Sequence, residues 1–456
     1  MIARGAETAR GSLAPRFEGR RVLIFGLGAF GGGGGAARFF AERGARVTVT
    51  DLRSREQLAD AIDAIADLPI EEWVLGEHRE SDFREHEIVV VNPAVPPKNR
   101  WLALARESGA RLETEIDLFL RYCRSRAIAG ITGSNGKSTT SQLAYEFLAA
   151  AGHQVHLGGN IGVSLLPIVD EIEPEDRVVL ELSSFQLERL DAPPPDVIAI
   201  TQFSENHIDW HGSLDAYRHA KERVLAPPAR RPGIAVLPTH DPLFTQWSEK
   251  TSRTVVPFSP DDAIDTPPGL RGRANRANVA AAAAVATALG ADDASIATGL
   301  QSFRPLPHRQ EWVDQVGGIT YVNDSKATTP EAACGALEAW GKRVVVLLGG
   351  TTKGGSFERL IESVQEHAHS TVVYGAAADP LHRTLVEGGV PEAQVHRVDD
   401  FRGAFRAARN IAVEGDTILL SPACASFDEF RNYEDRGECF RRLVSDLRGD
   451  GPKPVR

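Results

Sequence analysis

The clearest chemical signal in the chain is the glycine-rich segment 130–139, with the sequence GITGSNGKST. An apolar run precedes it and a helical pattern follows it, which is the setting of a phosphate-binding loop. In such a loop, backbone N–H groups bind phosphate oxygens, Lys137 would reach the β- and γ-phosphates, and the Ser138 hydroxyl would bind Mg²⁺. Ile131 stands where the strict pattern has its first glycine. The segment predicts a nucleoside triphosphate site; the alternative is an ordinary turn that carries a surface lysine.

A second glycine motif, GLGAFG at 26–31, also lies between an apolar run and a helical pattern. Asp51 follows Gly31 by 20 residues, which is where dinucleotide-binding folds have their ribose-binding acid. The glycines would let the backbone approach a pyrophosphate at a helix N-terminus. This motif is weak by itself, so a dinucleotide site, the diphosphate of another nucleotide and a close-packed glycine turn all stay open.

Three single residues are further candidates for chemistry. Glu181 ends the apolar run 178–180, and the active sites of α/β proteins lie at the carboxyl ends of their strands. It is therefore a candidate ligand for the same Mg²⁺ as Ser138, with an acid that caps a loop as the alternative. Taken alone, His207 is expected to have a structural role as a hydrogen-bonding side chain. Lys221 follows fourteen residues later in a short polar helix, and this setting alone predicts that its side chain is exposed to solvent.

Three blocks of alternating strands and helices would position these residues, which agrees with the rough prior of one domain per about 150 residues. We expect an α/β fold class with three consecutive domains and mainly parallel sheets. After a flexible tail at 1–17, these are a Rossmann-like domain at 18–114, a P-loop ATPase-like domain at 115–304 and a second Rossmann-like domain at 305–456. Strands are predicted at 21–25, 47–50, 88–91, 128–132, 178–180, 197–200, 344–348, 371–374 and 417–420. Helices are predicted at about 36–43 and at 278–288, and the segment 226–272 is expected to form loops with one short strand near 234–237.

Composition and charge exclude several classes of protein. The chain of 456 residues is 42% hydrophobic and 25% charged, which excludes a disordered, collagenous or disulfide-knotted protein. Its net charge of −11 argues against a nucleic-acid or membrane-surface partner. No apolar run approaches the ~18 residues of a membrane span, and no secretion signal is visible, so we expect a cytoplasmic protein. The cysteines form no CxxC pair and are expected to be reduced, with the thiol of Cys424 packed: Cys123, Cys334, Cys424 and Cys439.

The motifs follow one another in an order that resembles the Mur ligases, the ATP-dependent enzymes that form amide bonds in peptidoglycan assembly. The resemblance covers nearly the whole chain after residue 18. It rests on GSNGKST at 133–139, GNIG at 159–162, ELSSFQL at 181–187, NHID at 206–209, His308-Arg309, NDSKAT at 323–328 and LGG at 348–350. The segment SPACASFD at 421–428 resembles the terminal motif of the members that add D-glutamate, and the Asp-Asn-Pro-Arg motif of the members that add diaminopimelate is absent.

The resemblance implies an ATP-dependent ligase that adds D-glutamate to UDP-N-acetylmuramoyl-L-alanine through an acyl phosphate. It implies two Mg²⁺ sites and a monomeric enzyme. The residues implied for catalysis are Lys137, Glu181, His207 and Lys221. The implied Mg²⁺ ligands are Ser138, Glu181, His207 and a carbamylated Lys221, the last formed with CO₂.

The same resemblance implies the binding residues. Those for ATP are Gly133, Ser134, Asn135, Gly136, Lys137, Ser138, Thr139, Asn275, Asn278, Arg309 and Asp324. Those for the uridine diphosphate and muramyl parts are Gly28, Ala29, Phe30, Asp51, Arg53 and Asn160. Those for D-glutamate are Thr328, Lys353, Ser426 and Phe427, and Lys326 would contact nucleotide or substrate after domain closure. The chain departs from the family at Ala274, where a histidine is usual, and at Ala29-Phe30, where a hydroxyl is common.

Several alternatives stay open. Asn275 could be a helix N-cap, and Asn160 could be purely conformational. For the whole chain, the rivals are an NAD-dependent oxidoreductase built on the first glycine motif, a related ligase such as another Mur ligase or folylpolyglutamate synthetase, and a P-loop NTPase that only binds partners.

Overall fold

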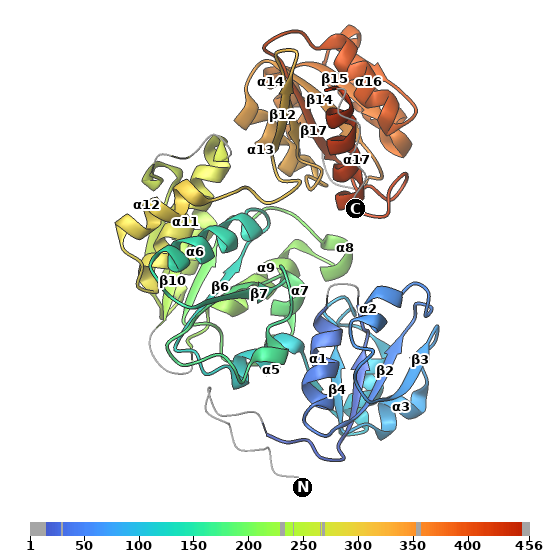
Figure 1. Ribbon diagram of the computed structural model, residues 1–456, viewed down its shortest axis with the longest axis vertical. Coiled ribbons are helices and arrows are strands. Elements are labelled where there is room, and N and C mark those ends of the chain that lie inside the picture. The colour runs from blue at the N-terminus through green and yellow to red at the C-terminus, as the bar shows by residue number, and fades with distance from the viewer. Residues whose placement is uncertain are drawn as a thin grey trace. The chain divides into compact units, whose positions relative to one another are not determined.

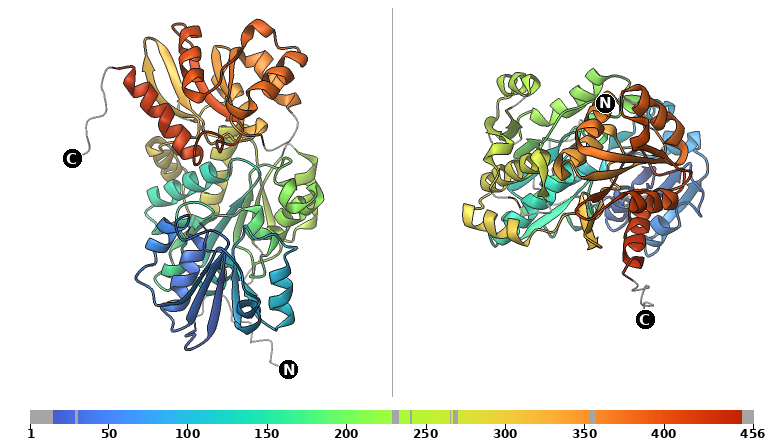
Figure 2. Two further views of the ribbon diagram at one scale, coloured as in Figure 1. Left: turned by 90° about the vertical axis from the view of Figure 1, so that its right-hand side faces the viewer. Right: turned by 90° about the horizontal axis from the view of Figure 1, so that it is seen from above.

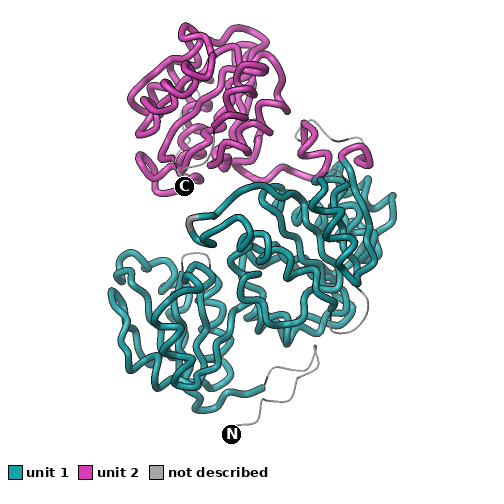
Figure 3. Tube along the Cα trace, turned by 180° about the vertical axis from the view of Figure 1, so that it is seen from behind, with its two compact units in different colours: residues 1–259, 278–302 teal, residues 260–277, 303–456 magenta. Residues whose placement is uncertain are grey.

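The computed structural model describes residues 15–28, 31–228, 233–239, 241–264, 266, 270–352 and 357–448. They form two compact units, which Figure 3 distinguishes by colour. Unit 1 comprises residues 1–259 and 278–302, and unit 2 comprises residues 260–277 and 303–456. Unit 1 contains two sheets and unit 2 contains one, so each predicted α/β block has a sheet of its own.

The first sheet of unit 1 is parallel, in the order β3-β2-β1-β4-β5, and helices cover both of its faces (Figures 1 and 2). Alternate residues of β1 explain this, because Val22 and Ile24 belong to one apolar core and Leu23 and Phe25 to another. The strands are β1 (Arg21–Phe25), β2 (Arg46–Asp51), β3 (Ile70–Leu75), β4 (Ile88–Val91) and β5 (Arg111–Glu113). The helices are α1 (Gly32–Ala41), α2 (Ala59–Asp63), α3 (Glu80–Glu85) and α4 (Arg100–Glu107).

The second sheet of unit 1 is also parallel, in the order β11-β10-β9-β6-β8-β7. Its strand β6 is fully buried, and the phosphate-loop segment follows it directly. The strands are β6 (Ala127–Thr132), β7 (Val155–Gly159), β8 (Arg177–Glu181), β9 (Val197–Ile200), β10 (Ile234–Pro238) and β11 (Thr254–Phe258). The helices are α5 (Glu115–Tyr122), α6 (Lys137–Ala150), α7 (Ser184–Glu188), α8 (Ile208–His211), α9 (Leu214–Glu222), α10 (Pro242–Lys250), α11 (Gly272–Ala288), whose first turns belong to unit 2, and α12 (Asp293–Ser302).

The sheet of unit 2 has the order β12-β13-β17-β14-β15-β16 and is parallel except for the antiparallel pair β12–β13. Two apolar cores lie on its two faces. The strands are β12 (Glu311–Val316), β13 (Ile319–Asn323), β14 (Val344–Gly349), β15 (Ala368–Tyr374), β16 (Val395–Arg397) and β17 (Thr417–Ala423). The helices are α13 (Pro330–Trp340), α14 (Glu358–His367), α15 (Ala378–Glu387), α16 (Phe401–Ile411) and α17 (Tyr433–Asp446).

The predicted α/β class with three sheets is confirmed, but two helices begin earlier than predicted. Helix α1 begins at Gly32, inside the glycine run, instead of near residue 36. The run is explained by close packing, since a Cβ on Gly33 would overlap the carbonyl of Leu27 and one on Gly35 would overlap Ser164. Helix α11 begins at Gly272, six residues before the predicted start.

The prediction for 226–272 was wrong in part, because this segment also contains α10 and β11. Pro257 lies within β11 and weakens its sequence signal, yet β11 is the last strand of its sheet, where a proline is tolerated. Helix α10 begins after Asp241, whose side chain accepts a hydrogen bond from the backbone N–H of Leu243, and it buries Phe244 and Trp247. None of the helices that the structure describes has the length and apolar character needed to cross a bilayer.

Candidate active site

The phosphate-loop segment forms a tight turn at the N-terminus of α6. Gly133 and Gly136 have φ values of 150° and 83°, which favour glycine. A Cβ on Gly133 would overlap the Thr201 hydroxyl, and one on Gly136 would overlap Oδ1 of Asn278. The N-cap residue Gly136 has no side chain with which to cap the helix, so this end of a 14-residue helix is suited to a phosphate group. The turn therefore has the backbone conformation that a phosphate-binding loop requires.

Lys137 folds back over this loop. Its Nζ donates to the carbonyl oxygens of Gly133 at 3.0 Å and Ser134 at 2.9 Å. Ser138, the next residue, is buried in the first turn of α6. The Ser134 hydroxyl is held by Tyr217 at 2.8 Å and by the carbonyl of Ser204 at 2.9 Å. The ammonium group of Lys137 thus lies against the glycine turn. A lysine that only pointed into solvent would not make these contacts.

Glu181 ends β8 and pairs in register with Ile131 of the neighbouring strand β6. Its side chain is buried, and its Oε1 accepts a hydrogen bond of 2.7 Å from Nδ2 of Asn160. Its Oε2 is also buried, but no described residue gives it a hydrogen bond. A buried carboxylate oxygen without a partner is costly, and a divalent cation would satisfy it. No group of three His, Cys, Asp or Glu side chains in the described ranges could hold a metal, so a site here needs hydroxyl or substrate oxygens as well.

Lys221 on α9 is only 1% exposed, so the alternative of a solvated lysine is wrong. Its Nζ donates to the carbonyl of Gly133 at 2.9 Å and to Oγ1 of Thr132 at 3.3 Å, and lies 4.9 Å from the ring centre of Tyr217. Burial and the charge of Lys137 lower the pKa of Lys221 well below its ordinary value, although Glu181 acts in the opposite direction. The side chain is therefore directed under the phosphate loop.

His207 precedes the short helix α8 and has a positive φ of 54°. Its ring centre lies 4.8 Å from that of Phe185, the second residue of α7. Two of its neighbours also make polar contacts. Nε2 of His211 lies 3.0 Å from the Ser184 hydroxyl, and Nε1 of Trp210 donates to the carbonyl of Ala94 at 3.3 Å, so α8 contacts the segment after β4.

The first glycine motif packs against a residue that the sequence did not identify as functional. The Asn92 side chain lies so close that a Cβ on Gly28 would be 2.6 Å from its Nδ2. Asp51 accepts hydrogen bonds from the backbone N–H of Leu27 at 3.0 Å and from Nε of Arg53 at 3.2 Å. Burial acts to raise the pKa of Asp51, but hydrogen bonds from Arg53 and Gly28 outweigh it and lower the pKa. Its carboxylate is thus already engaged by the chain, while Ala29 and Phe30 lie outside the described residues.

The two asparagines of α11 differ. Oδ1 of Asn278 accepts a hydrogen bond of 3.4 Å from the Thr140 hydroxyl of α6, so it lies beside the phosphate loop. Asn275 lies inside α11, and its Nδ2 donates to the carbonyl of Arg271 at 3.0 Å. The N-cap alternative for Asn275 is therefore wrong, since α11 begins three residues before it and its side chain donates rather than accepts.

The candidate residues of unit 2 follow its central strands. Asp324 follows β13 and is buried; burial raises its pKa to about 7, although Oγ of Ser421 donates to it at 2.8 Å. Nζ of Lys326 donates to the Tyr433 hydroxyl at 2.7 Å. Ser426 is buried, whereas the side chain of Phe427 is 69% exposed. Thr328 and Arg309 are half-buried, and Lys353 lies outside the described residues. All four cysteines are buried and none forms a disulfide, which confirms the packed thiol of Cys424.

Models of known families match three parts of this chain. They are described as "Mur ligase MurD-like, N-terminal domain" over residues 20–113, "Mur ligase middle domain" over residues 131–267 and "Mur ligase, glutamate ligase domain" over residues 308–424. The chain belongs to the Mur ligase family. It is therefore an ATP-dependent ligase, and the alternative of an NAD-dependent oxidoreductase is wrong, because the first match contains the glycine motif on which that alternative depended.

Relatives that match along nearly their whole length show which Mur ligases this chain is similar to. It is 39% identical to a UDP-N-acetylmuramoylalanine--D-glutamate ligase of Roseiflexus sp. (strain RS-1), over 94% of this chain and 99% of that protein. It is 35% identical to the protein of the same name from Geotalea uraniireducens (strain Rf4), over 94% and 98%. The crystal structure of the UDP-N-acetylmuramate-alanine ligase of Thermotoga maritima has a TM-score of 0.59 and 18% identity, over 93% and 99% of the two chains, and shares the fold.

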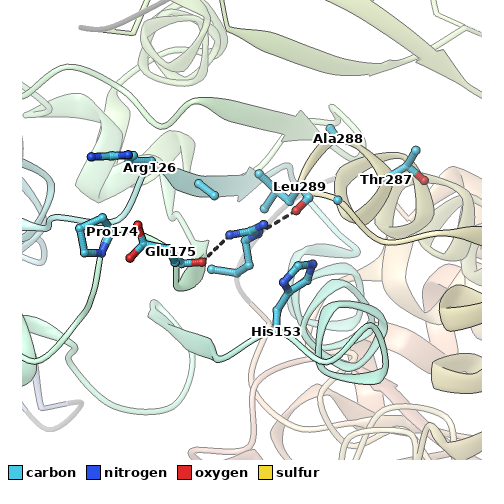
Figure 4. A pocket seen from close by; sticks show the side chains of 10 residues that line it. Arg126, His153, Pro174, Glu175, Thr287, Ala288 and Leu289 are labelled. Atoms are coloured by element: carbon cyan, nitrogen blue, oxygen red, sulfur yellow. Dashed lines mark hydrogen bonds between the residues drawn. The ribbon is translucent and has the colours of Figure 1, made fainter.

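One open pocket of this Mur ligase, with a volume of about 560 Å³, contains none of the predicted site residues (Figure 4). It lies at the starts of β6 and β8, whereas the phosphate loop and Glu181 follow the ends of these strands. Nε of Arg177 donates to the carbonyl of Leu289 at 2.7 Å, just after the last residue of α11. A cation at the C-terminal end of a helix is stabilising, so Arg177 has a structural role here.

Proposed function

We propose that this Mur ligase joins D-glutamate to the alanine carboxylate of UDP-N-acetylmuramoyl-L-alanine, with ATP as the phosphoryl donor, in cytoplasmic synthesis of peptidoglycan precursors. The observation that carries the choice of substrates is the match to relatives of this name along 98% or more of their length. The phosphate loop and the buried Glu181 support the ATP chemistry from within the chain.

The reaction has two steps. A carboxylate oxygen of the alanine attacks the γ-phosphorus of ATP, the bond from that phosphorus to ADP breaks, and an acyl phosphate forms. The amine of D-glutamate then attacks the acyl carbon, the bond to phosphate breaks, and the nitrogen loses a proton. Both steps gather anions, so they need fixed cations and N–H donors more than covalent catalysis. Lys137 and the first turn of α6 would supply these for the phosphates.

Ser138 and Glu181 would hold the Mg²⁺ that accompanies ATP, which fits the buried Oε2 of Glu181. Bound there, Mg²⁺ would neutralise phosphoryl oxygens and favour their transfer. For a second Mg²⁺ we propose His207 and a carbamylated Lys221. The neutral amine of Lys221 would attack CO₂, forming an N–C bond and releasing a proton. Its burial and lowered pKa support this step, because only an uncharged amine reacts.

Binding roles follow from the family motifs. We propose that Gly28, Ala29, Phe30, Asp51 and Arg53 bind the uridine diphosphate part, and that Asn160 orients the muramyl part. ATP would be bound by 133–139 together with Asn275, Asn278, Arg309 and Asp324. D-glutamate would be bound by Thr328, Lys353, Ser426 and Phe427, and Lys326 would contact nucleotide or substrate. We also propose a monomeric state and domain boundaries after residues 17, 114 and 304.

Amino-acid-dependent release of phosphate from ATP tests this function. With UDP-N-acetylmuramoyl-L-alanine present, D-glutamate should stimulate release, whereas L-glutamate, L-alanine and diaminopimelate should not. Stimulation by one of these others would point to another Mur ligase, and glutamate addition to a folate would point to a folylpolyglutamate synthetase. Release that no amino acid stimulates would favour an NTPase that only binds partners.

A further inference from the structure

Arg436, in the first turn of α17, is fully buried at 0% exposure, and none of the sequence motifs contains it. A buried guanidinium is costly unless its N–H groups find acceptors. No carboxylate of the described part of unit 2 lies within ion-pair distance of it. Neutral acceptors must therefore satisfy this charge.

These acceptors come from the segments that follow three strands. Nε donates to Oγ of Ser325 at 2.9 Å, and Nη2 donates to the carbonyl of Ser325 at 2.9 Å. Nη2 also donates to the carbonyl of Cys424 at 3.1 Å, and Nη1 to that of Gly349 at 3.3 Å. These residues follow or end β13, β17 and β14, which are adjacent in the sheet. One side chain thus ties together the carboxyl ends of three neighbouring strands.

The segments after β14 and β17 also contact each other directly. The backbone N–H of Thr351 donates to the carbonyl of Ala425 at 2.7 Å, and the reverse bond measures 2.9 Å. A Cβ on Gly350 would lie only 3.1 Å from Nη1 of Arg436 and would overlap the Ala425 carbonyl. The guanidinium therefore fills the space beneath these segments and sets their separation.

We infer that Arg436 is a positioning residue for the acceptor amino acid, holding the segments that carry Thr328 and Ser426 in one arrangement. Ser426 lies two residues after Cys424, and Thr328 lies three residues after Ser325. This inference rests on the proposed function, which assigns both hydroxyls to D-glutamate. Because Arg436 has no exposed surface, it would act through these segments and not by touching a reactant. Without its bonds the segments could shift separately, and the acceptor site would no longer be preorganised.

The test is the steady-state kinetics of Arg436→Lys, which keeps the charge but loses the forked donor. We expect the KM for D-glutamate to rise about tenfold or more, because small misplacements of binding groups are costly, while the KM for UDP-N-acetylmuramoyl-L-alanine stays within about twofold. Arg448→Ala is the matched control, since this arginine lies just after α17 and pairs with Asp314 at the surface. It should leave all the constants unchanged.

If Arg436→Lys does not fold, Ser325→Ala is the deciding variant. It removes the acceptor of Nε, together with the hydrogen bond of 2.8 Å that Oγ of Ser325 donates to the carbonyl of Tyr433, and should raise the KM for D-glutamate about threefold. An unchanged KM for D-glutamate in the variant that folds, with only a lower Tm or kcat, would overturn the inference in favour of a purely structural arginine. An equal rise in the KM of all substrates would do the same. Wild-type enzyme that D-glutamate does not stimulate would instead refute the proposed function.

Discussion

Replacing Lys221 by alanine separates two roles that the structure permits for this side chain. As an amine it tethers the phosphate loop, through its hydrogen bonds to Gly133 and Thr132. As a carbamate it would be an anionic Mg²⁺ ligand. Because the two roles have opposite charge, small molecules that refill the space left by the side chain should distinguish them.

The size of the perturbation follows from the contacts. Lys221→Ala removes three buried methylenes, at about 0.8 kcal/mol each, and two hydrogen bonds, at about 1 kcal/mol each. The variant also no longer buries an amine beside Lys137, which offsets part of this loss. We expect a folded protein that is destabilised by about 2–4 kcal/mol. Its kcat should fall by about 10²–10³, as when one preorganised electrostatic group is removed from an active site.

The assay is phosphate release with all three substrates and added acetate or ethylammonium. Acetate should restore part of the activity of Lys221→Ala, and ethylammonium should not. Lys250→Ala, at an exposed lysine that ends α10, is the matched control and should respond to neither. In the wild type, ¹³C-bicarbonate should give a carbamate signal that Lys221→Ala lacks. Full activity of the variant, or rescue by ethylammonium alone, would refute the carbamate and leave Lys221 as a tether.

Three further predictions concern the other parts of the site. Gly136→Ala should lower the free energy of unfolding by about 1–3 kcal/mol in urea titrations and abolish the thermal shift caused by ATP, because its Cβ would overlap Asn278 at a positive φ; a normal ATP shift would contradict the loop assignment. Asn160→Ala should lower kcat by about tenfold and raise the Mg²⁺ concentration needed for half activity, since Oε1 of Glu181 loses its donor; an unchanged Mg²⁺ titration would contradict this. Asp324→Asn should be more stable than the wild type by about 2–4 kcal/mol at pH 8 but not at pH 4. Burial raises the folded-state pKa of Asp324 to about 7, above the unfolded value of 3.8, so wild-type stability is complete below the unfolded value and falls as pH rises towards 7; equal pH profiles of Tm would refute the assignment.

The sequence predicted best those features that depend on neighbours along the chain. The phosphate loop, Glu181 at the end of β8 and most strands of the three sheets were visible as local patterns of glycine, charge and apolar residues. The edge strand β11 was not predicted, because its proline argues against a strand in the sequence. A proline is tolerated there since no further strand pairs with β11 on that side.

Features that depend on packing between distant segments could not be predicted. Lys221 occurs in a polar sequence, and only the contact of α9 with the phosphate loop shows that it is buried. One member of the glycine run at the start of α1, Gly35, is explained by Ser164, which lies more than 100 residues later. The sequence likewise does not distinguish Arg436 from the other arginines, because its three acceptor segments come together only in the folded sheet of unit 2.

In each unit, a buried basic side chain contacts the carboxyl end of a set of three adjacent strands. In unit 1 the adjacent strands β9, β6 and β8 lead into Thr201, the phosphate loop and Glu181, and in unit 2 the adjacent strands β13, β17 and β14 lead into the segments held by Arg436. The buried basic side chain is Lys221 in unit 1, which bonds to the phosphate loop at Gly133, and Arg436 in unit 2, which bonds to all three segments. Arginine keeps its charge at any working pH and has four acceptor contacts here, so it suits a fixed support. Lysine can lose its proton when buried, and Lys221 has two such contacts with described residues, so under the proposed carbamylation its amine would be the one to take up CO₂.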